Sequence, residues 1–461
     1  MKIKNISISG LHGSKNICIP ITDNKIVLVG ENGSGKTTIV TLIHYCLTSQ
    51  WSAAEKINFD SIKFTFDSGE ISIAKNEIKS YLRLSETGKE SDSIDSYIIQ
   101  RLKKIDANRY KTTEEAIKKI CDDMRMPENI RTEITNRMKI FDFTALKQLT
   151  EKSSKIESMC PFIIFMPTYR RIEKELDTIF PEFTKDFAKF EHRFNKVNSN
   201  LRYFELVKFG MKDVRQLIDD SLTELKASIR DKLNSLTAGY LKFVIENKGR
   251  ASQKDQISQF TDDVLKRIFD RIQFSDQHLI DPSAVINNMH EINQKHRIDP
   301  IDNVVIKYIT LLKGVDIEQS QNESQIRMFV SICNKYLGDK QMILNQAKYE
   351  LRITQNESGE EIDFDDLSSG EKQIASIFAH LLLGKMNSYF LIFDEPELSL
   401  SVDWQRKFLE DIAKLPSCSG LIAVTHSPFI FENSLDKFAI SIEECQSFAR
   451  VETSHEGLVR N

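Results

Sequence analysis

Short apolar segments separated by polar turns mark the beginning of the chain. Residues 3–8, 17–21 and 25–29 each carry the isoleucine- and valine-rich pattern of a β-strand. A hairpin is expected next, with strands at 62–66 and 70–74 joined by an Asp-Ser-Gly turn. The first 75 residues therefore predict a β-rich segment.

The pattern then changes to that of helices. Residues 114–150 are charged and helical in pattern, and the apolar run 162–166 between two prolines is a candidate buried strand. Between 185 and 345, apolar positions recur in steps of three and four, which predicts a long amphipathic helix. Gly239 and Gly249 interrupt the repeat, so a compact helical subdomain is favoured over a long coiled-coil rod. The stripe consists of Val214, Leu217, Ile218, Leu222, Leu225, Ile229, Leu233, Leu236, Tyr240 and Val244.

Strands and helices alternate in the last part of the chain. Two undivided apolar strands with a helix between them are typical of a parallel sheet that is covered on both faces. The fold class expected is therefore α/β. The predicted elements are strands at 348–354, 362–364, 389–393 and 420–424, and helices at 372–385 and 402–414.

Composition narrows the function classes. The 461 residues carry 63 Lys and Arg against 67 Asp and Glu, a net charge of −4, so any nucleic-acid surface must be a local patch. The seven cysteines are dispersed and contain no C-x-x-C pair, which argues against a disulfide framework and a zinc site. Neither a signal peptide nor an apolar run near the ~20 residues of a membrane span is present. A cytoplasmic protein without membrane attachment is expected.

A glycine-rich segment after the strand at 25–29 fits the phosphate-binding pattern G-x-x-x-x-G-K-[ST]. Backbone N–H groups would surround the phosphates, the lysine would reach the β and γ oxygens, and the hydroxyl after it would coordinate Mg²⁺. A chance glycine-rich turn is the alternative, which the preceding strand and following helix disfavour. The predicted nucleotide-binding residues are Gly30, Asn32, Gly33, Ser34, Gly35, Lys36, Thr37 and Thr38.

Two carboxylates end the apolar strand at 389–393. Carboxyl ends of parallel strands are where open α/β sheets bind ligands. Asp394 is predicted to hold Mg²⁺ together with Thr37, and Glu395 to be the general base that orients the attacking water. A surface turn that merely begins with two acids is the alternative interpretation.

Two further segments complete the set. Residues 367–371, Leu-Ser-Ser-Gly-Glu, form a capping box that could start any helix, but a helix N-terminus with free hydroxyls also binds anions. Ser368, Ser369 and Gly370 are the predicted contacts there. His426 follows the strand at 420–424, where a lone histidine is more often a satisfied core residue than a catalytic one.

These motifs, in this order, resemble the SMC/Rad50/OLD-type branch of the ABC ATPases. The resemblance implies an ABC-type P-loop ATPase head that binds ATP and Mg²⁺, with a helical subdomain inserted. It also implies that residues 368–370 contact the γ-phosphate held by a second copy, so that ATP joins a homodimer or a larger oligomer. His426 would be the catalytic switch histidine and 397–401 the loop that crosses the interface. The domains expected are 1–184 and 346–461 for the head, and 185–345 for an insert that serves dimerisation or partner binding.

A narrower resemblance concerns residues 167–173, 209–214 and 394–400. They are similar to the PtuA family, the ATPases of the Septu antiphage system, and to retron-associated relatives. This likeness implies an HNH nuclease partner, with the ATPase as sensor and scaffold and no nuclease site of its own; only 35 residues follow His426. The alternatives are a repair ATPase of the RecF or Rad50 type acting on DNA, a transporter subunit, which the long insert disfavours, and a scaffold that hydrolyses ATP slowly.

Overall fold

The computed structural model describes most of the chain. The described residues are 2–31, 33–87, 101, 113–124, 126–138, 143–160, 162–167, 203–205, 211–247, 261–272, 281–295, 299–346, 348–384 and 386–446. They divide into two compact units, Met1–Phe209 with Asn387–Asn461, and Gly210–Met386. The three-part division at 184/185 and 345/346 stays a prediction.

A parallel sheet organises the first unit. Its six strands lie in the order β13-β3-β12-β11-β6-β7, and every neighbouring pair is parallel. The predicted undivided strands are its centre, and β11 is buried at each of its six positions. The strands are β3 (Lys25–Val29), β6 (Phe162–Met166), β7 (Tyr203–Glu205), β11 (Tyr389–Asp394), β12 (Cys418–Thr425) and β13 (Ala439–Ser441).

Helices cover both faces of this sheet. Alternate residues of each strand point to opposite faces, and in β11 apolar residues are buried on both faces. Phe390 and Ile392 of β11 share a core with helix α1 (Lys36–Leu47). Phe393, of the other parity, meets Phe408 of α16 (Val402–Ala413), with ring centroids 5.7 Å apart. Two-sided burial explains why β11 reads as a continuous apolar run.

An antiparallel sheet accounts for the β-rich beginning. Its order is β2-β1-β4-β5, which confirms the predicted hairpin as β4 and β5. Helices α2, α3 and α7 pack near it, and α5 and α6 pack on each other. The bounds are β1 (Ile3–Leu11), β2 (Lys15–Pro20), β4 (Ser61–Phe66), β5 (Gly69–Ala74), α2 (Trp51–Ala54), α3 (Lys75–Thr87), α5 (Thr113–Asp123), α6 (Glu128–Met138) and α7 (Phe143–Met159).

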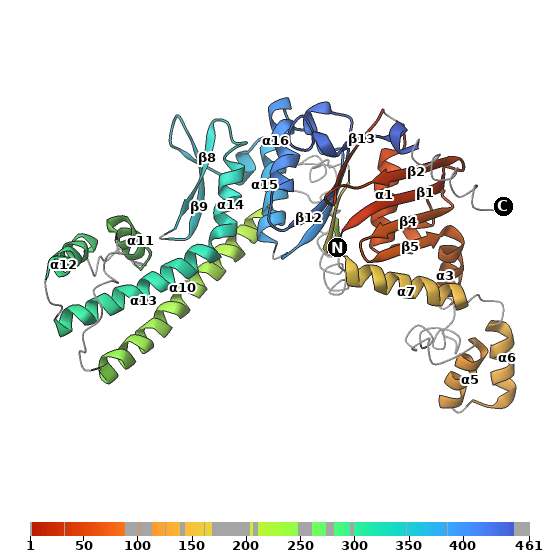
Figure 1. Ribbon diagram of the computed structural model, residues 1–461, viewed down its shortest axis with the longest axis horizontal. Helices are drawn as coiled ribbons and strands as arrows, with labels where there is room; N and C mark the ends of the chain where they lie inside the picture. The colour runs from red at the N-terminus through yellow and green to blue at the C-terminus, as the bar shows by residue number, and fades with distance from the viewer. Residues whose placement is uncertain are drawn as a thin grey trace. The chain divides into compact units, whose positions relative to one another are not determined.

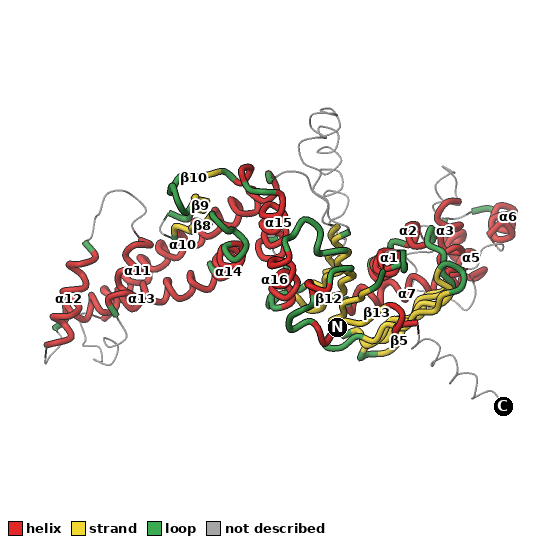
Figure 2. Tube along the Cα trace, turned by 90° about the horizontal axis from the view of Figure 1, so that it is seen from above, coloured by secondary structure: helices red, strands yellow, loops and turns green. Residues whose placement is uncertain are grey.

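The second unit contains a helical hairpin rather than only a compact cluster. Helix α10 (Lys212–Asn247) has 36 residues and lies beside α13 (Pro300–Asn322) in both views (Figures 1 and 2). The expected interruption at Gly239 is wrong: the helix continues through it. A glycine costs a helix ~1 kcal/mol, and packing outweighs that cost here, since Leu236 is buried and Tyr240 contacts Tyr308 edge-on at 4.9 Å.

Short helices and a small sheet complete this unit. An antiparallel sheet has the order β10-β9-β8, and α14 lies against both β8 and α15. The predicted strands at 348–354 and 362–364 correspond to β9 and the shorter β10. The bounds are α11 (Asp262–Ile272), α12 (Pro282–Gln294), α14 (Ser324–Cys333), α15 (Ser369–Leu383), β8 (Lys340–Asn345), β9 (Glu350–Gln355) and β10 (Glu361–Ile362).

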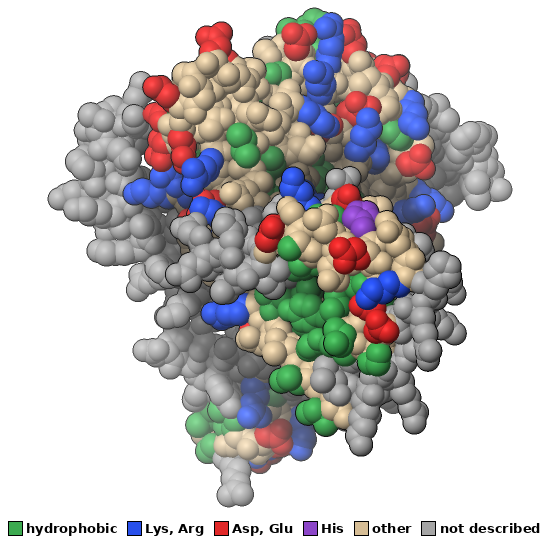
Figure 3. All heavy atoms as spheres, turned by 90° about the vertical axis from the view of Figure 1, so that its left-hand side faces the viewer, with side chains coloured by type: hydrophobic (Ala, Val, Ile, Leu, Met, Phe, Trp, Pro, Cys, Tyr) green, Lys and Arg blue, Asp and Glu red, His purple; other side chains and the backbone are tan. Residues whose placement is uncertain are grey.

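Apolar side chains are exposed at the outer end of the helical hairpin. Leu241 and Ile245 near the end of α10 are 55% and 73% exposed, and Ile301 at the start of α13 is 77% exposed. Figure 3 shows hydrophobic side chains gathered on this side of the molecule, among intermixed basic and acidic ones. No helix in the described part of the chain is long and apolar enough to span a membrane.

Candidate functional site

The loop between β3 and α1 has the backbone that a phosphate-binding loop requires. Gly33 and Gly35 adopt φ angles of 82° and 100°, in the left-handed region where a side chain would be strained. Gly35 is also the N-cap residue that precedes α1, so the first N–H groups of the helix lie next to the loop. Gly30 is tightly packed, because a Cβ there would lie 3.1 Å from the Ser34 hydroxyl.

Lys36 folds back over this loop. Its Nζ donates hydrogen bonds to the carbonyl oxygens of Gly30 and Glu31 at 2.7 and 2.8 Å, and lies 3.2 Å from His426 Nδ1. The residue is 4% exposed. Burial lowers the pKa of Lys36, and the carboxylates of Glu395, Glu397 and Asp394 oppose that decrease. The lysine is thus a buried cation facing a group of acids.

The two predicted Mg²⁺ ligands lie together. Thr37 Oγ1 donates a 3.1 Å hydrogen bond to Asp394 Oδ1. Asp394 is 1% exposed at the end of β11, while Thr37 stands in the first turn of α1. A hydroxyl and a carboxylate are the oxygen ligands that a P-loop ATPase offers to Mg²⁺.

Glu395 and His426 face each other beside this pair. His426 Nε2 lies 3.5 Å from Glu395 Oε1, and both side chains are about a quarter exposed, at 28% and 24%. Glu395 has a φ angle of 52°, unusual for a residue with a side chain, and its N–H donates to the Val424 carbonyl at 2.9 Å. The turn after β11 is therefore fixed to β12, the strand that leads to His426.

Glu397, the first residue of the predicted interface loop 397–401, is also a member of this site, for which the sequence predicted no contact with His426. Its Oε1 accepts a 2.8 Å hydrogen bond from the backbone N–H of His426, and its Oε2 is buried without a hydrogen-bond partner among the described residues. Gln405 joins the same loop, because its Nε2 donates to the Leu400 carbonyl and its Oε1 accepts from Ser427 Oγ. A third acid in the run Asp-Glu-Pro-Glu was the available signal.

The segment 367–371 lies in the second unit, at the start of α15. Ser368 caps the helix: its Oγ accepts from the Glu371 N–H, and its own N–H donates to Glu371 Oε2 at 2.7 Å. Ser369 and Gly370 form the first turn. Asp213 of α10 pairs with His380 of α15 at 2.9 Å, so the helix is also held further along.

The loop before α15 is tied to α10 as well. Arg215 pairs with Asp363 and, at 2.6 Å, with Asp365. Both acids belong to the turn that leads into Ser368, where a 3-10 helix spans Phe364–Asp366. Ion pairs to α10 therefore fix both the turn before Ser368 and the helix that follows it.

The remaining predicted residues differ in how far they can be placed. Ser34 Oγ is buried and without a hydrogen-bond partner among the described residues, and Thr38 is half-buried in α1. Asn32 lies outside the described residues, as do 168–173 and 209–210 of the two narrower motifs. Gln100 also lies outside the described residues, and Gln148 is exposed on α7.

A parallel α/β sheet with a P-loop before α1, two carboxylates at the end of β11 and a histidine at the end of the neighbouring β12 defines an ABC-type P-loop ATPase. The predicted fold class is confirmed. A family model described as an AAA ATPase domain matches residues 1–431, so the chain belongs to that family of nucleotide-binding domains. No curated protein matches the chain.

Several solved Smc heads are similar to the chain at low identity. One, from Pyrococcus furiosus, has an extended coiled coil and is bound to the C-terminal domain of ScpA: 14% identity, TM-score 0.34, 93% of this chain and 91% of that chain covered. Another is an SmcHead bound to the C-winged helix domain of ScpA, with 13% identity and a TM-score of 0.32, where 93% of this chain and 91% of that chain are covered. A third, from Pyrococcus yayanosii, has a coiled coil and joint; its identity is 13% and its TM-score 0.30, and 98% of this chain and 99% of that chain are covered. These TM-scores are low, so the family match carries the assignment.

Proposed function

We propose that this chain binds Mg²⁺-ATP and hydrolyses it, in a site completed by a second copy. One observation supports the chemistry most directly. Lys36, Glu395 and His426 come from three separate segments, yet they form a continuous series of polar contacts, with 3.2 Å from Lys36 to His426 and 3.5 Å from His426 to Glu395. A cation to balance phosphate charge and a base to accept a proton from water, positioned by an imidazole, would assist hydrolysis of a phosphoanhydride.

The residues of the first unit fit Mg²⁺-ATP. The left-handed Gly33 and Gly35 carry no side chains at their two positions of the loop, and the buried Ser34 hydroxyl lacks a partner among the described residues. Lys36 Nζ is held at that loop by the carbonyl oxygens of Gly30 and Glu31 and by His426 Nδ1. When bound, Mg²⁺-ATP would supply the phosphoryl group and a metal that offsets its charge, with Thr37 as one ligand.

The chain's own groups would then act on water. Glu395 Oε1 would accept the proton from the attacking water, and His426 Nε2 holds that oxygen at 3.5 Å. Glu397 fixes the backbone of His426 through the 2.8 Å hydrogen bond to its N–H. Asp394 orients Thr37 and adds negative charge beside the metal position. Lys36 would balance the charge of the terminal phosphate.

Ser368, Ser369 and Gly370 are proposed to contact the nucleotide that a second copy holds. The start of α15 supports this role, since its first N–H groups and the serine hydroxyls form an anion-binding helix N-terminus. ATP would then join two copies, and the N-terminal end of α15 would be the surface that senses it.

The biological role proposed is that of a sensor and scaffold for an HNH nuclease in antiphage defence. The likeness of residues 167–173, 209–214 and 394–400 to the Septu ATPases supports it. The exposed apolar side chains of Leu241, Ile245 and Ile301 at the end of the α10–α13 hairpin offer a surface that such a partner could cover. Among the described residues, no group of three or more His, Cys, Asp or Glu could hold a metal ion.

Co-expression with the neighbouring gene tests this role. The purified complex is weighed by native mass spectrometry with and without ATP. A stable co-complex that contains an HNH protein is expected. An ATP-dependent dimer that ignores the neighbour and binds duplex DNA, with an affinity that falls steeply with salt, would instead identify a repair ATPase.

A further inference from the structure

A buried carboxylate stands at the N-terminal end of α15. Glu371 is the third residue of the helix, and its side chain is 6% exposed. One of its oxygens already accepts the Ser368 N–H at 2.7 Å. A carboxylate in the first turn favours the helix by itself, but it also places a negative charge where an incoming phosphate would need positive potential.

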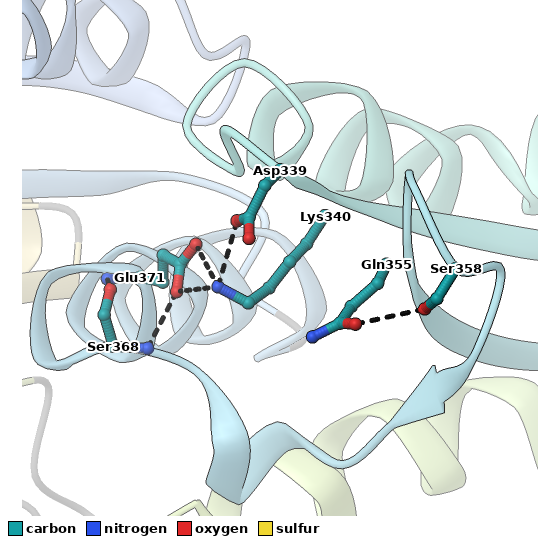
Figure 4. Close-up of polar contacts among 6 residues, drawn as sticks. All are labelled: Asp339, Lys340, Gln355, Ser358, Ser368 and Glu371. Carbon is teal, nitrogen blue, oxygen red and sulfur yellow. Dashed lines mark hydrogen bonds and ion pairs between the residues drawn. The ribbon is translucent and has the colours of Figure 1, made fainter.

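Lys340 lies directly on this carboxylate. Its Nζ, at the start of β8, is 3.2 Å from both oxygens of Glu371 and 3.2 Å from Asp339 Oδ1 (Figure 4). The lysine side chain is 15% exposed. Burial opposes its charge, yet the hydrogen bonds to Glu371 and Asp339 outweigh burial and raise the pKa of Lys340. The amine is therefore charged at neutral pH.

The small sheet holds the lysine in this place. Lys340 pairs with Gln355 in the β8–β9 register, and the Gln355 Oε1 accepts a hydrogen bond from Ser358 Oγ at 3.1 Å (Figure 4). The loop bearing Asp339 is also fixed, since the Asn356 N–H donates to the Asp339 carbonyl at 2.9 Å. The backbone of Lys340 is thus fixed by strand pairing, which positions its amine against the start of α15.

We infer that Lys340 is a positioning residue of the segment 367–371: it neutralises and fixes Glu371, so that the start of α15 can receive the terminal phosphate held by a second copy. This inference rests on the proposed function, because it assumes the two-copy site. Lys340 and the P-loop belong to different units. Loss of the lysine should therefore weaken ATP-dependent assembly without weakening the binding of ATP to a single chain.

Four full-length variants test the inference: Lys340→Met, Lys340→Arg, Glu371→Gln, and the double variant Lys340→Met with Glu371→Gln. Glutamine retains the capping box but removes the charge. Lys348→Met is the matched control, because Lys348 is exposed in the turn between β8 and β9. Binding of a fluorescent ATP analogue is measured at low protein concentration. Dimerisation is followed by sedimentation with a non-hydrolysable analogue, and thermal unfolding of each variant is recorded.

The expected result is a dimer dissociation constant at least tenfold higher for Lys340→Met, with nucleotide affinity within twofold of the wild type. Lys340→Arg and the double variant should have dimer dissociation constants within threefold of the wild-type value. In ATPase assays, Lys340→Met should need more protein for half-maximal activity while the kcat at saturating protein changes little. A role in folding alone would instead lower the unfolding temperature without recovery in the double variant, and would overturn the inference.

The remaining outcomes separate the two levels of the proposal. A wild-type chain that assembles with ATP, and a Lys340→Met variant that assembles equally well, would overturn the role of Lys340 alone. A double variant as weak as Lys340→Met would do the same, because charge compensation would then not be the cause. A wild-type chain that binds ATP and stays monomeric would refute the two-copy site, and the inference with it.

Discussion

Thr37 donates a 3.1 Å hydrogen bond to Asp394, although 357 residues separate them along the chain. The contact joins the first turn of α1 to the end of β11 and brings together the two oxygens predicted to bind Mg²⁺. Because the sheet is parallel, the ends of β3, β11 and β12 meet at one edge. Every catalytic role proposed for the first unit depends on that edge.

Lys36→Ala should abolish ATP binding. The substitution removes the only side-chain amine at the loop among the described residues, and the loss expected is at least about 100-fold in affinity, the scale of a charge-assisted contact worth about 3 kcal/mol. Isothermal titration of ATP measures it. Lys56→Ala, on the exposed surface, is the control. Unchanged affinity in Lys36→Ala would mean that this loop does not bind the nucleotide.

Glu395→Gln should bind ATP and fail to release it as product. Glutamine has the shape of glutamate but cannot accept the proton from water, so turnover should fall about 100-fold or more, the scale of general-base catalysis. Because bound ATP would persist, dimers should become more abundant. Single-turnover assays and sedimentation measure both effects. A variant that hydrolyses ATP normally would remove Glu395 from the role of base.

Glu397 should act through geometry and not through charge. Glu397→Ala frees the His426 N–H and is expected to lower kcat about tenfold, the scale of one hydrogen bond of about 1.4 kcal/mol. Glu397→Gln retains an oxygen acceptor and should keep most of the activity. Steady-state kinetics separate the two variants. Equal loss in both would indicate that the negative charge beside Lys36 is what matters.

Acid should destabilise the first unit through His44. This side chain is buried in α1, stacked on Phe165 at 4.4 Å, and burial lowers its pKa to about 4 from an ordinary 6.5. The unfolded chain therefore binds the proton first as the pH falls, and stability is lost between pH 6.5 and about 4. The expected loss is about 3 kcal/mol. Urea unfolding at several pH values measures it, and His44→Phe should show a flatter pH dependence.

Gly420→Ala should destabilise the sheet. A Cβ at this position of β12 would lie 2.5 Å from both the Phe390 ring and the Asn24 amide. Phe390 is fully buried, and Asn24 bridges the Ile3 N–H and the Ser419 carbonyl, so neither can move freely. A cost of about 1–3 kcal/mol is expected from such overpacking. Thermal unfolding tests it against Gly239→Ala, where a Cβ meets nothing within 4 Å.

Much of the site was predictable because its chemistry is local in sequence. The loop at 30–37 and the acids that end β11 are recognisable from residue type, spacing and the apolar strand before them. The order of the strands was not predictable, because pairing depends on packing between segments far apart in sequence. The edge strands β7 and β13 have three residues each, too few for a periodic signal.

Contacts between single charged side chains could not be predicted from the sequence for a similar reason. Lys340 and Glu371 are 31 positions apart, and nothing in either local pattern links β8 to the start of α15. At Gly239 the sequence predicted an interruption that the structure does not have. Helix propensity alone disfavours the glycine, but α10 continues through it and packs on α13 through the Tyr240–Tyr308 contact. Local rules failed where tertiary packing decided the outcome.

The position of β3 has a consequence for the synthesis of the chain. Both of its neighbours in the sheet, β12 and β13, are translated more than 380 residues later, at Cys418–Thr425 and Ala439–Ser441. Until the ribosome has delivered them, the strand before the P-loop has two open edges, and such edges readily pair with the wrong partner. The nucleotide site therefore cannot be complete until β12 has been synthesised, and until then the first segment is exposed to incorrect strand pairing.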